Sequence, residues 1–232
     1  MKGFDKLPST SDYIKEHLNE LKNFDGVYTA NQTAGRGRTG HTWEVEPGRN
    51  ATFSILVKEE YIVKKFNIVS IITAIAVSNY LENIGMPNVQ IKWPNDVLVD
   101  GKKICGILLE GKIPEYLIIG IGVNVNQTRF EGFEATSIKN ILDLKIQPSL
   151  VAADINNLVL DYITDVGSDL SEYIDEYEEK DFLLDKEISF NYNGKPLEGT
   201  AKGINLDGSL KVLHNGEILN LTSDEVNLIK AK

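Results

Sequence analysis

The stretch of sequence that decides the fold reads VQIKWPNDVLVDGKKICGILLE and covers residues 89–110. Val89–Lys92, Val97–Val99 and Lys103–Glu110 are short runs rich in apolar residues, a pattern that is typical of β-strands. Asp100-Gly101 separates two of these runs and is a strong signal for a two-residue hairpin turn. The sequence therefore predicts closely spaced strands here, two of them joined by a hairpin.

Segments on both sides of this stretch add further strands and helices. Apolar residues surround much of a predicted helix at Val63–Asn83, which indicates that the helix is well buried. Gly85 and Pro87 follow it in the order expected at a helix end. The other predicted elements are strands at Val27–Asn31, Ala51–Val57 and Tyr116–Val125, a helix that begins near Thr10 or Ser11, and helical residues from Ser149 to about Lys180 that Gly167 divides.

The pattern changes after about Leu184. Asn193-Gly194, Asp207-Gly208 and Asn215-Gly216 are turn signals, and short alternating strands lie between them. Three such turns so close together are typical of a small all-β barrel. The sequence therefore predicts an α+β domain at residues 1–184 and a C-terminal β-barrel domain at residues 185–232.

Charge and composition exclude several classes of protein. The chain has 232 residues and a formal net charge of -10, from 34 acidic and 24 basic residues. A general nucleic-acid binder needs a clustered basic face, so nucleic acid is not an expected partner, although a small basic pocket for one nucleotide is compatible with this charge. Cys105 is the only cysteine and reads as a buried apolar residue, so no internal disulfide is expected. No apolar run is long enough for a signal peptide or a membrane span, which makes a cytoplasmic location the expectation.

The densest chemical signal is QTAGRGRTGHTW at residues 32–43. Its glycines leave backbone N–H groups free to approach an anion, and Arg36 and Arg38 add permanent positive charges that suit phosphate or carboxylate. Trp43 offers a flat face for a purine. The segment lacks the Gly-Lys-Ser/Thr ending of a P-loop and the βαβ setting of a dinucleotide site. Taken alone, it is equally compatible with a flexible basic surface loop.

Three further segments are individually weak signals. Lys92–Asp96 (KWPND) places a lysine at the end of a strand, Lys103–Glu110 (KICGILLE) carries a strand glycine, and Gly120–Asn126 (GIGVNVN) ends a strand with small residues and amides. In this order and at these distances, the four segments resemble those of the biotin–protein ligase family. The resemblance covers most of the chain. Because a Ser-Thr pair already stands at Ser9-Thr10, the chain looks like the form without an N-terminal DNA-binding domain.

The resemblance implies a biotin/lipoate ligase-like catalytic domain, with a mixed central β-sheet and flanking helices, followed by a small C-terminal SH3-like β-barrel. It implies an enzyme that activates biotin with ATP and Mg²⁺ to biotinyl-5′-AMP and transfers the biotinyl group to a lysine in the biotin acceptor domain of a carboxylase. Biotin, ATP and a biotin carboxyl-carrier protein are therefore the expected partners, and no membrane partner is expected. Relatives often pair through their central sheets, so a homodimer is compatible with the resemblance.

The resemblance also implies roles for individual residues. The biotin pocket it implies consists of Ser9, Thr10, Ser11, Gln32, Gly35, Arg36, Gly37, Lys92, Gly106 and Leu108. The adenylate site it implies consists of Arg36, Arg38, Trp43, Asn95 and Asn124, with no metal ligands. Lys92 and Arg38 are the implied catalytic residues, which would neutralise the repulsion between a carboxylate and a phosphate. Ser11 and His41 depart from the family pattern, which usually has asparagine and arginine there.

Three alternative functions remain open from the sequence. A lipoate ligase would share the fold and the reaction type, although the complete 32–43 and KWPND segments favour biotin. A biotin-binding sensor that no longer transfers biotin is compatible with the departures at Ser11 and His41. A nucleotide-binding adaptor has no support beyond the 32–43 segment itself.

Overall fold

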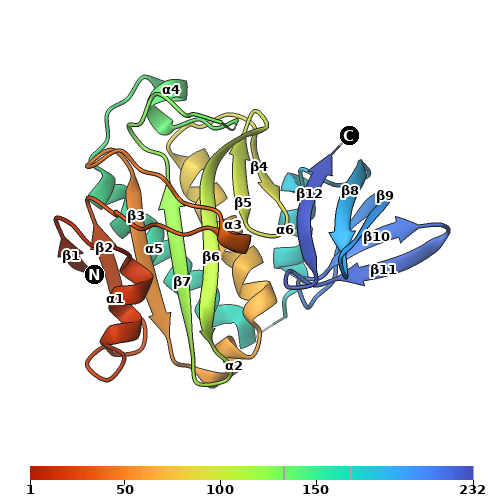
Figure 1. Ribbon diagram of the computed structural model, residues 1–232, viewed down its shortest axis with the longest axis horizontal. Coiled ribbons are helices and arrows are strands. Elements are labelled where there is room, and N and C mark those ends of the chain that lie inside the picture. The colour runs from red at the N-terminus through yellow and green to blue at the C-terminus, as the bar shows by residue number, and fades with distance from the viewer. Residues whose placement is uncertain (133, 168, 232) are drawn as a thin grey trace.

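A computed structural model describes residues 1–132, 134–167 and 169–231 and consists of two β-sheets with helices packed around them (Figure 1). The larger sheet has seven strands in the order β1-β2-β3-β7-β6-β5-β4. Neighbouring strands are antiparallel except β1 and β2, so the sheet is mixed, as predicted. Its strands are β1 (Lys2–Phe4), β2 (Gly26–Thr29), β3 (Ala51–Val57), β4 (Val89–Lys92), β5 (Asp96–Val99), β6 (Lys102–Lys112) and β7 (Tyr116–Val123).

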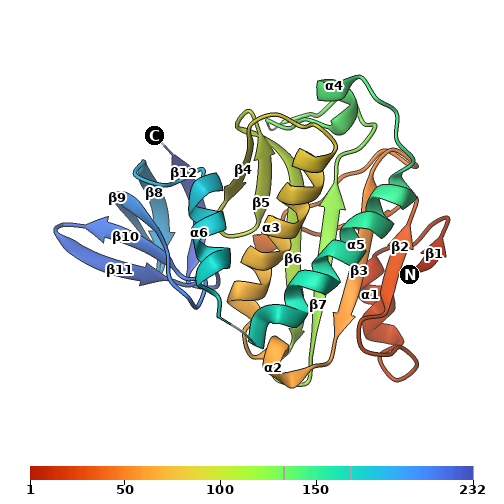
Figure 2. The same ribbon diagram turned by 180° about the vertical axis from the view of Figure 1, so that it is seen from behind.

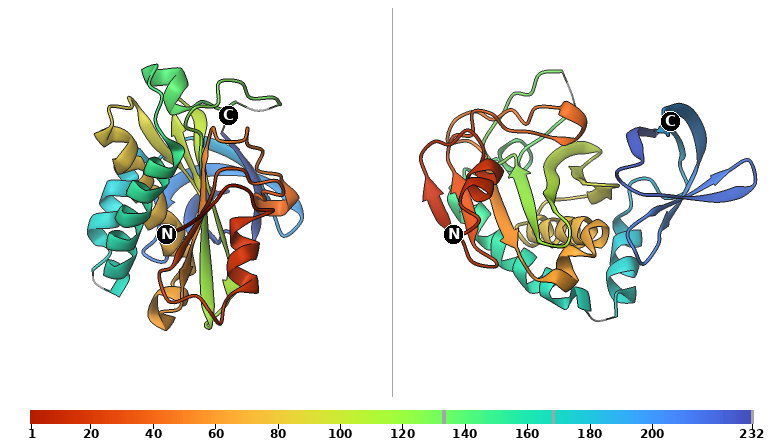
Figure 3. Two further views of the ribbon diagram at one scale, coloured as in Figure 1. Left: turned by 90° about the vertical axis from the view of Figure 1, so that its left-hand side faces the viewer. Right: turned by 60° about the horizontal axis from the view of Figure 1, so that its bottom comes forward.

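Helices cover the two faces of this sheet unequally. The long helices α3 (Phe66–Asn83) and α5 (Pro148–Thr164) pack on one face, and α1 (Thr10–Glu16) lies on the other (Figures 2 and 3). The helix α6 (Ser171–Lys180) packs beside α3 and leads to the second sheet. The short elements are α2 (Glu60–Val63), η1 (Arg38–Gly40), α4 (Ile138–Leu142) and η2 (Asp165–Gly167). The face that carries α1 is therefore only partly covered by helix.

Side-chain alternation along β3 explains the difference between the faces. Phe53, Ile55 and Val57 belong to the main core beneath α3 and α5. Because successive strand residues point to opposite faces, Thr52, Ser54 and Leu56 point the other way. Leu56 packs in a smaller core with Ile14 of α1, and the buried polar side chains of Thr52 and Ser54 lie on the same face.

Two predicted helix boundaries need correction. The helix predicted at Val63–Asn83 begins only at Phe66, because Lys65 has a non-helical backbone and separates α3 from the short helix α2. Ser9, rather than Thr10 or Ser11, caps α1, and its Oγ accepts a hydrogen bond of 3.3 Å from the backbone N–H of Asp12. Both predicted caps lie inside the helix with buried side chains. The elements β1 and α4 were not predicted, because neither is long enough to show a period.

The second sheet is antiparallel in the order β11-β10-β9-β8-β12. Its predicted turns at Asn193-Gly194 and Asn215-Gly216 are confirmed, since all four residues have the positive φ that such hairpins require. The indole N–H of Trp93 donates to the carbonyl of Gly208 at 2.9 Å and so joins the two sheets. Its strands are β8 (Glu187–Tyr192), β9 (Lys195–Ile204), β10 (Leu210–His214), β11 (Glu217–Leu221) and β12 (Val226–Ala231). The division into domains at residue 184 stays a prediction.

Asp181 follows α6 where the chain passes the edge strand β4, and we expect this carboxyl to make stability depend on pH. Burial raises its pKa to about 6, and its Oδ2 has no hydrogen-bond partner among the described residues. A raised pKa means that the protonated carboxyl favours the folded state, and this contribution is lost as the pH rises through 6. Asp181→Asn should therefore be more stable than the wild type by about 1–3 kcal/mol at pH 7–8, and the difference should shrink toward pH 4.

Urea unfolding of both proteins across this pH range would measure the effect. Asp175→Asn, on the exposed face of α6, is the matched control and should change little. A variant Asp181→Asn that is less stable than the wild type at pH 8 would contradict the expectation.

Candidate active site

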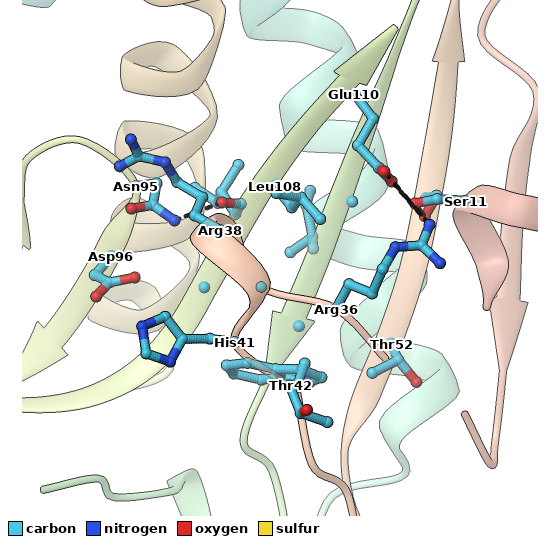
Figure 4. Close-up of a pocket in the computed structure, with 18 of the residues that line it drawn as sticks. Ser11, Arg36, Arg38, His41, Thr42, Thr52, Asn95, Asp96, Leu108 and Glu110 are labelled. Carbon is cyan, nitrogen blue, oxygen red and sulfur yellow. Dashed lines mark hydrogen bonds and ion pairs between the residues drawn. The ribbon is translucent and has the colours of Figure 1, made fainter. Parts of the chain in front are cut away.

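A pocket of about 450 Å³ opens on the face of the large sheet that α1 only partly covers (Figure 4). Its floor is formed by β3, β6 and β7, and its walls by the start of α1, the 32–43 loop and the KWPND segment. The predicted site residues that line it are Ser9, Thr10, Ser11, Gln32, Arg36, Gly37, Arg38, Trp43, Lys92, Asn95, Gly106 and Leu108. Two predicted residues, Gly35 and Asn124, do not line it.

One end of the pocket carries a buried group of hydroxyls. Ser54 Oγ lies 2.7 Å from Thr10 Oγ1 and 3.0 Å from Ser11 Oγ. Gln32 Oε1 accepts a hydrogen bond of 3.0 Å from the backbone N–H of Thr10, which fixes the amide beside them. Hydroxyls can both donate and accept, so this end suits a ligand with a compact polar head. Ser54 was missed from the sequence, although the alternation of polar Thr52 and Ser54 with the apolar residues of β3 could have indicated it.

The 32–43 loop folds back on itself as a small hairpin. The backbone N–H of Trp43 donates to Gly35 O at 3.0 Å, and that of Gly37 donates to His41 O at 2.7 Å. A Cβ on Gly35 would lie 2.4 Å from the carbonyl oxygen of Trp43, so only glycine fits there. Gly35 therefore shapes the loop from behind the pocket wall, and its predicted contact with biotin stays a prediction.

Arg36 points toward α1 and the end of β6 (Figure 4). Its guanidinium forms two hydrogen bonds of 2.6 Å with the two carboxylate oxygens of Asp12 and lies 3.4 Å from Glu110. Lys15 Nζ lies 2.8 Å from Glu110 as well. The hydrogen bonds from Arg36 lower the pKa of the Asp12 carboxyl. We call Asp12, Lys15, Arg36 and Glu110 the mouth network, because they join the loop to both sides of the pocket opening.

Arg38 points away from Arg36 (Figure 4), and its hydrogen-bond partners belong to the second sheet and the turn before β12. Its guanidinium donates to the backbone carbonyls of Ser223 and Val226, and burial lowers its pKa. Arg38 also borders a second cavity of about 380 Å³ that adjoins the pocket and reaches Ser223 and Asp224. The predicted catalytic arginine thus lies at the boundary of two cavities, with its charge directed at the second sheet.

Lys92 has a different environment from both arginines. Its half-buried ammonium lines the pocket and makes no hydrogen bond or ion pair with any residue that the structure describes. Burial lowers its pKa, which Asp96 only partly offsets, so the positive charge is poorly compensated. A cation in this state gains from any anion that enters the pocket.

Lys103 is a second pocket cation that was not among the predicted site residues. Its Nζ lies 2.6 Å from Asp96 Oδ1 and 5.6 Å from the centre of the Trp43 ring. In a regular strand Lys103 and Gly106, three residues apart, would point to opposite faces. The pairing of β5 with β6 shifts register between Val97 and Leu98, and Lys103 reaches the same side as Gly106. Because a strand irregularity places Lys103, periodicity could not have found it.

Trp43 lies across the glycine floor of the pocket. A Cβ on Gly122 would lie 2.3–2.6 Å from the indole, and one on Gly106 would lie 3.1 Å from it. The indole Nε1 is buried and has no hydrogen-bond partner among the described residues. An unpaired buried donor is costly, so a ligand oxygen in this part of the pocket would be stabilised by it.

The two predicted amides of the adenylate site already have partners. Asn95 Nδ2 donates to Ile107 O at 2.7 Å and ties the KWPND segment to β6. Asn124 Nδ2 is buried and donates to Thr136 O at 3.0 Å. Their predicted contacts with the nucleotide stay predictions, and both side chains brace the strands that form the pocket. Within the described ranges there is no group of three or more histidine, cysteine or acidic residues that could hold a metal ion.

Sequence comparisons match this chain to biotin ligases and their relatives. A model of the biotin/lipoate A/B protein ligase family matches residues 3–124. The bifunctional ligase/repressor BirA of Escherichia coli K12 is 27% identical over 238 residues, which span 97% of this chain and 73% of that protein. The biotin–[acetyl-CoA-carboxylase] ligase of Mycobacterium tuberculosis is 35% identical over 124 residues, which span 50% of this chain and 46% of that protein.

Solved structures show the same fold along the whole chain. The biotin protein ligase from Aquifex aeolicus in complex with biotin and ATP superposes with a TM-score of 0.87 at 25% identity and covers 99% of this chain and 98% of that one. The Leishmania major biotin protein ligase in complex with biotinyl-5-AMP reaches a TM-score of 0.67 at 27% identity and covers 96% of this chain and 98% of that one.

Proposed function

Because this chain belongs to the biotin/lipoate A/B protein ligase family, we propose that it is a biotin–protein ligase that activates biotin with ATP and transfers it to a lysine of a carboxylase's biotin acceptor domain. Its similarity to biotin ligases along almost its full length supports this activity. The observation that carries the proposal is the unpaired, half-buried Lys92 in a pocket whose other end is lined by hydroxyls. This arrangement suits a molecule with a hydrogen-bonding head and an anionic tail, as biotin has.

The first step joins two anions, and the pocket supplies the charges that allow it. A carboxylate oxygen of biotin attacks the α-phosphorus of ATP, the bond to the leaving diphosphate breaks, and biotinyl-5′-AMP forms. Lys92 and Lys103 are the two ammonium groups that line the pocket, and together they offset the repulsion between carboxylate and phosphate. The unpaired Trp43 Nε1 offers a hydrogen bond on the nucleotide side.

Arg38 has to change partners if it takes the predicted catalytic role. In the free protein its guanidinium is satisfied by the carbonyls of Ser223 and Val226. A phosphate is a stronger acceptor for guanidinium than a neutral carbonyl, so bound ATP would draw Arg38 toward the pocket. Mg²⁺ supplied with ATP would offset part of the negative charge of its phosphates.

The second step transfers the biotinyl group. The amine of the acceptor lysine attacks the carbonyl carbon of biotinyl-5′-AMP, a new amide bond forms, and AMP leaves with the electrons of the broken anhydride bond. Closure of the 32–43 loop keeps water from the anhydride until the acceptor arrives. A carboxyl-carrier domain is the acceptor that this chemistry serves, and a cytoplasmic location stays part of the proposal.

Two structural features concern a membrane partner and a second copy of this chain. In the described part of the chain, no helix is both long and apolar enough to cross a membrane. The strand β1 forms one edge of the large sheet, and pairing of two such sheets into a homodimer stays a proposal.

A competition between biotin and lipoate tests the proposed substrate. The dithiolane ring of lipoate carries no hydrogen-bond donor, so the hydroxyls of Thr10, Ser11 and Ser54 favour the ureido ring of biotin. Acid-dependent ATP–pyrophosphate exchange should therefore occur with biotin and be at least about tenfold slower with lipoate at equal concentration. Faster exchange with lipoate than with biotin would show that the enzyme is a lipoate ligase of the same family.

A further inference from the structure

Arg36 is tied to the rest of the molecule before any ligand is present. It belongs to the tip of the 32–43 loop, whereas Asp12 lies on α1 and Glu110 lies on β6. Both guanidinium–carboxylate hydrogen bonds to Asp12 are 2.6 Å long, which is the bidentate geometry that arginine favours. Lys15 lies 2.8 Å from Glu110 and 3.8 Å from Asp12, so two positive and two negative charges balance at the pocket mouth.

The tip of the loop has few other anchors. The base of the loop is fixed by backbone hydrogen bonds from Thr33 to Leu7 and from Ala34 to Pro8. In the described part of the chain, the hydrogen bonds and ion pairs that run from Arg36–His41 to other elements come from Arg36 and Arg38 alone. The position of the tip over the pocket therefore depends on two side chains, of which only Arg36 bonds to the catalytic sheet and to α1.

We propose that Asp12, with Glu110, is a positioning residue that holds the 32–43 loop closed over the pocket through Arg36. The inference rests on the proposed function for the identity of the ligand beneath the loop. Arg36 differs from Lys92, since its donors are satisfied by the protein itself. Its charge serves to fix the loop, and biotin or its adenylate gains from a cover that is already in place.

The test uses the whole protein, four single variants and one double variant. Asp12→Asn removes one charge from the mouth network and keeps the size of the side chain. Glu16→Gln is the matched control, because Glu16 is exposed on the same helix and has no ion pair among the described residues. Glu110→Gln weakens the longer contact. Arg36→Ala supplies the background in which Asp12→Asn should have no further effect.

The first measurement needs no ligand. Trypsin cuts after arginine, so cleavage after Arg38, identified by mass spectrometry, reports how often the tip leaves the pocket mouth. Asp12→Asn should be cut roughly fivefold faster than the wild type, Glu110→Gln less so, and Glu16→Gln at the wild-type rate. High salt should accelerate cleavage of the wild type toward that of Asp12→Asn, because it screens exposed ion pairs.

The second measurement is the dissociation rate of bound biotin. It should rise roughly fivefold in Asp12→Asn, with no additional rise when Asp12→Asn is placed in the Arg36→Ala background. Equal trypsin cleavage of the wild type and Asp12→Asn would overturn the inference, as would an Asp12→Asn effect that persists undiminished without Arg36. If the cleavage pattern is as expected but the wild type binds no biotin, the positioning role stands and the proposed function fails.

Discussion

Lys92→Ala is expected to lower biotin-dependent ATP–pyrophosphate exchange by roughly 10² or more, about what the loss of one preorganised donor costs. The ammonium of Lys92 is half-buried and has no partner among the described residues, and burial lowers its pKa. Because this ammonium is unpaired, it contributes little to the stability of the fold and is available to bind an incoming anion. Its loss should therefore reduce the rate of adenylate formation more than the stability of the fold.

Matched lysine variants separate charge from packing. Lys92→Met keeps an unbranched apolar stem and should be as slow as Lys92→Ala, because the missing charge is the cause. Lys102→Ala removes an exposed ammonium at the start of β6 and should retain normal exchange. Near-normal exchange in Lys92→Ala would show that Lys92 has no role in adenylate formation. Lys103 would then be the remaining pocket ammonium that could take that role.

Gly122→Ala should have an effect of similar size on the nucleotide side. An added Cβ would lie 2.3–2.6 Å from the Trp43 indole, closer than atoms can approach, so the ring must leave its place. Displacement of a binding group by about 1 Å can cost roughly 10²-fold in rate. We expect the KM for ATP to rise by about that factor, with a smaller change in the KM for biotin.

Gly106→Ala should have a smaller effect than Gly122→Ala. Its added Cβ would lie 3.1 Å from the same ring, so a small movement of the Trp43 ring would relieve the contact. Tryptophan fluorescence can follow the ring directly, since Trp93 is the only other tryptophan and is buried. Gly122→Ala should change the emission of Trp43, and the change should be absent in a Trp43→Phe background. A normal KM for ATP together with unchanged emission would show that the ring does not depend on Gly122.

Local patterns in the sequence predicted much of the fold. The strands β3 and β4 begin and end at the predicted residues, because alternation or an apolar run between clear turns fixed both ends. The Asn-Gly hairpins of the second sheet were predictable because few residues accept positive φ. The break at Lys65 before α3 was not predicted, because apolar residues continue on both sides of it, at Ile62, Val63, Phe66 and Ile68.

The site was predictable to the extent that its residues form compact motifs. Lys92, Gln32 and Gly106 were found because each belongs to a short recognisable segment, and the structure brings them into one pocket. Lys103 was missed because a register shift between strands decides its direction. The contacts of Arg38 with the second sheet and of Arg36 with Asp12 join distant parts of the chain, and no local period encodes them.

The measurement that tests the central claim most directly is the mass of an acceptor domain after reaction. A purified biotin carboxyl-carrier domain is incubated with this protein, biotin and magnesium–ATP, and its intact mass is compared with that from reactions without ATP or with Lys92→Ala. If this protein is a biotin–protein ligase, the carrier domain should gain the mass of one biotinyl group in the complete reaction and none without ATP. With Lys92→Ala, a far smaller fraction of the domain should gain that mass. No mass gain with an authentic carrier domain, together with no heat of biotin binding in calorimetry, would contradict the account.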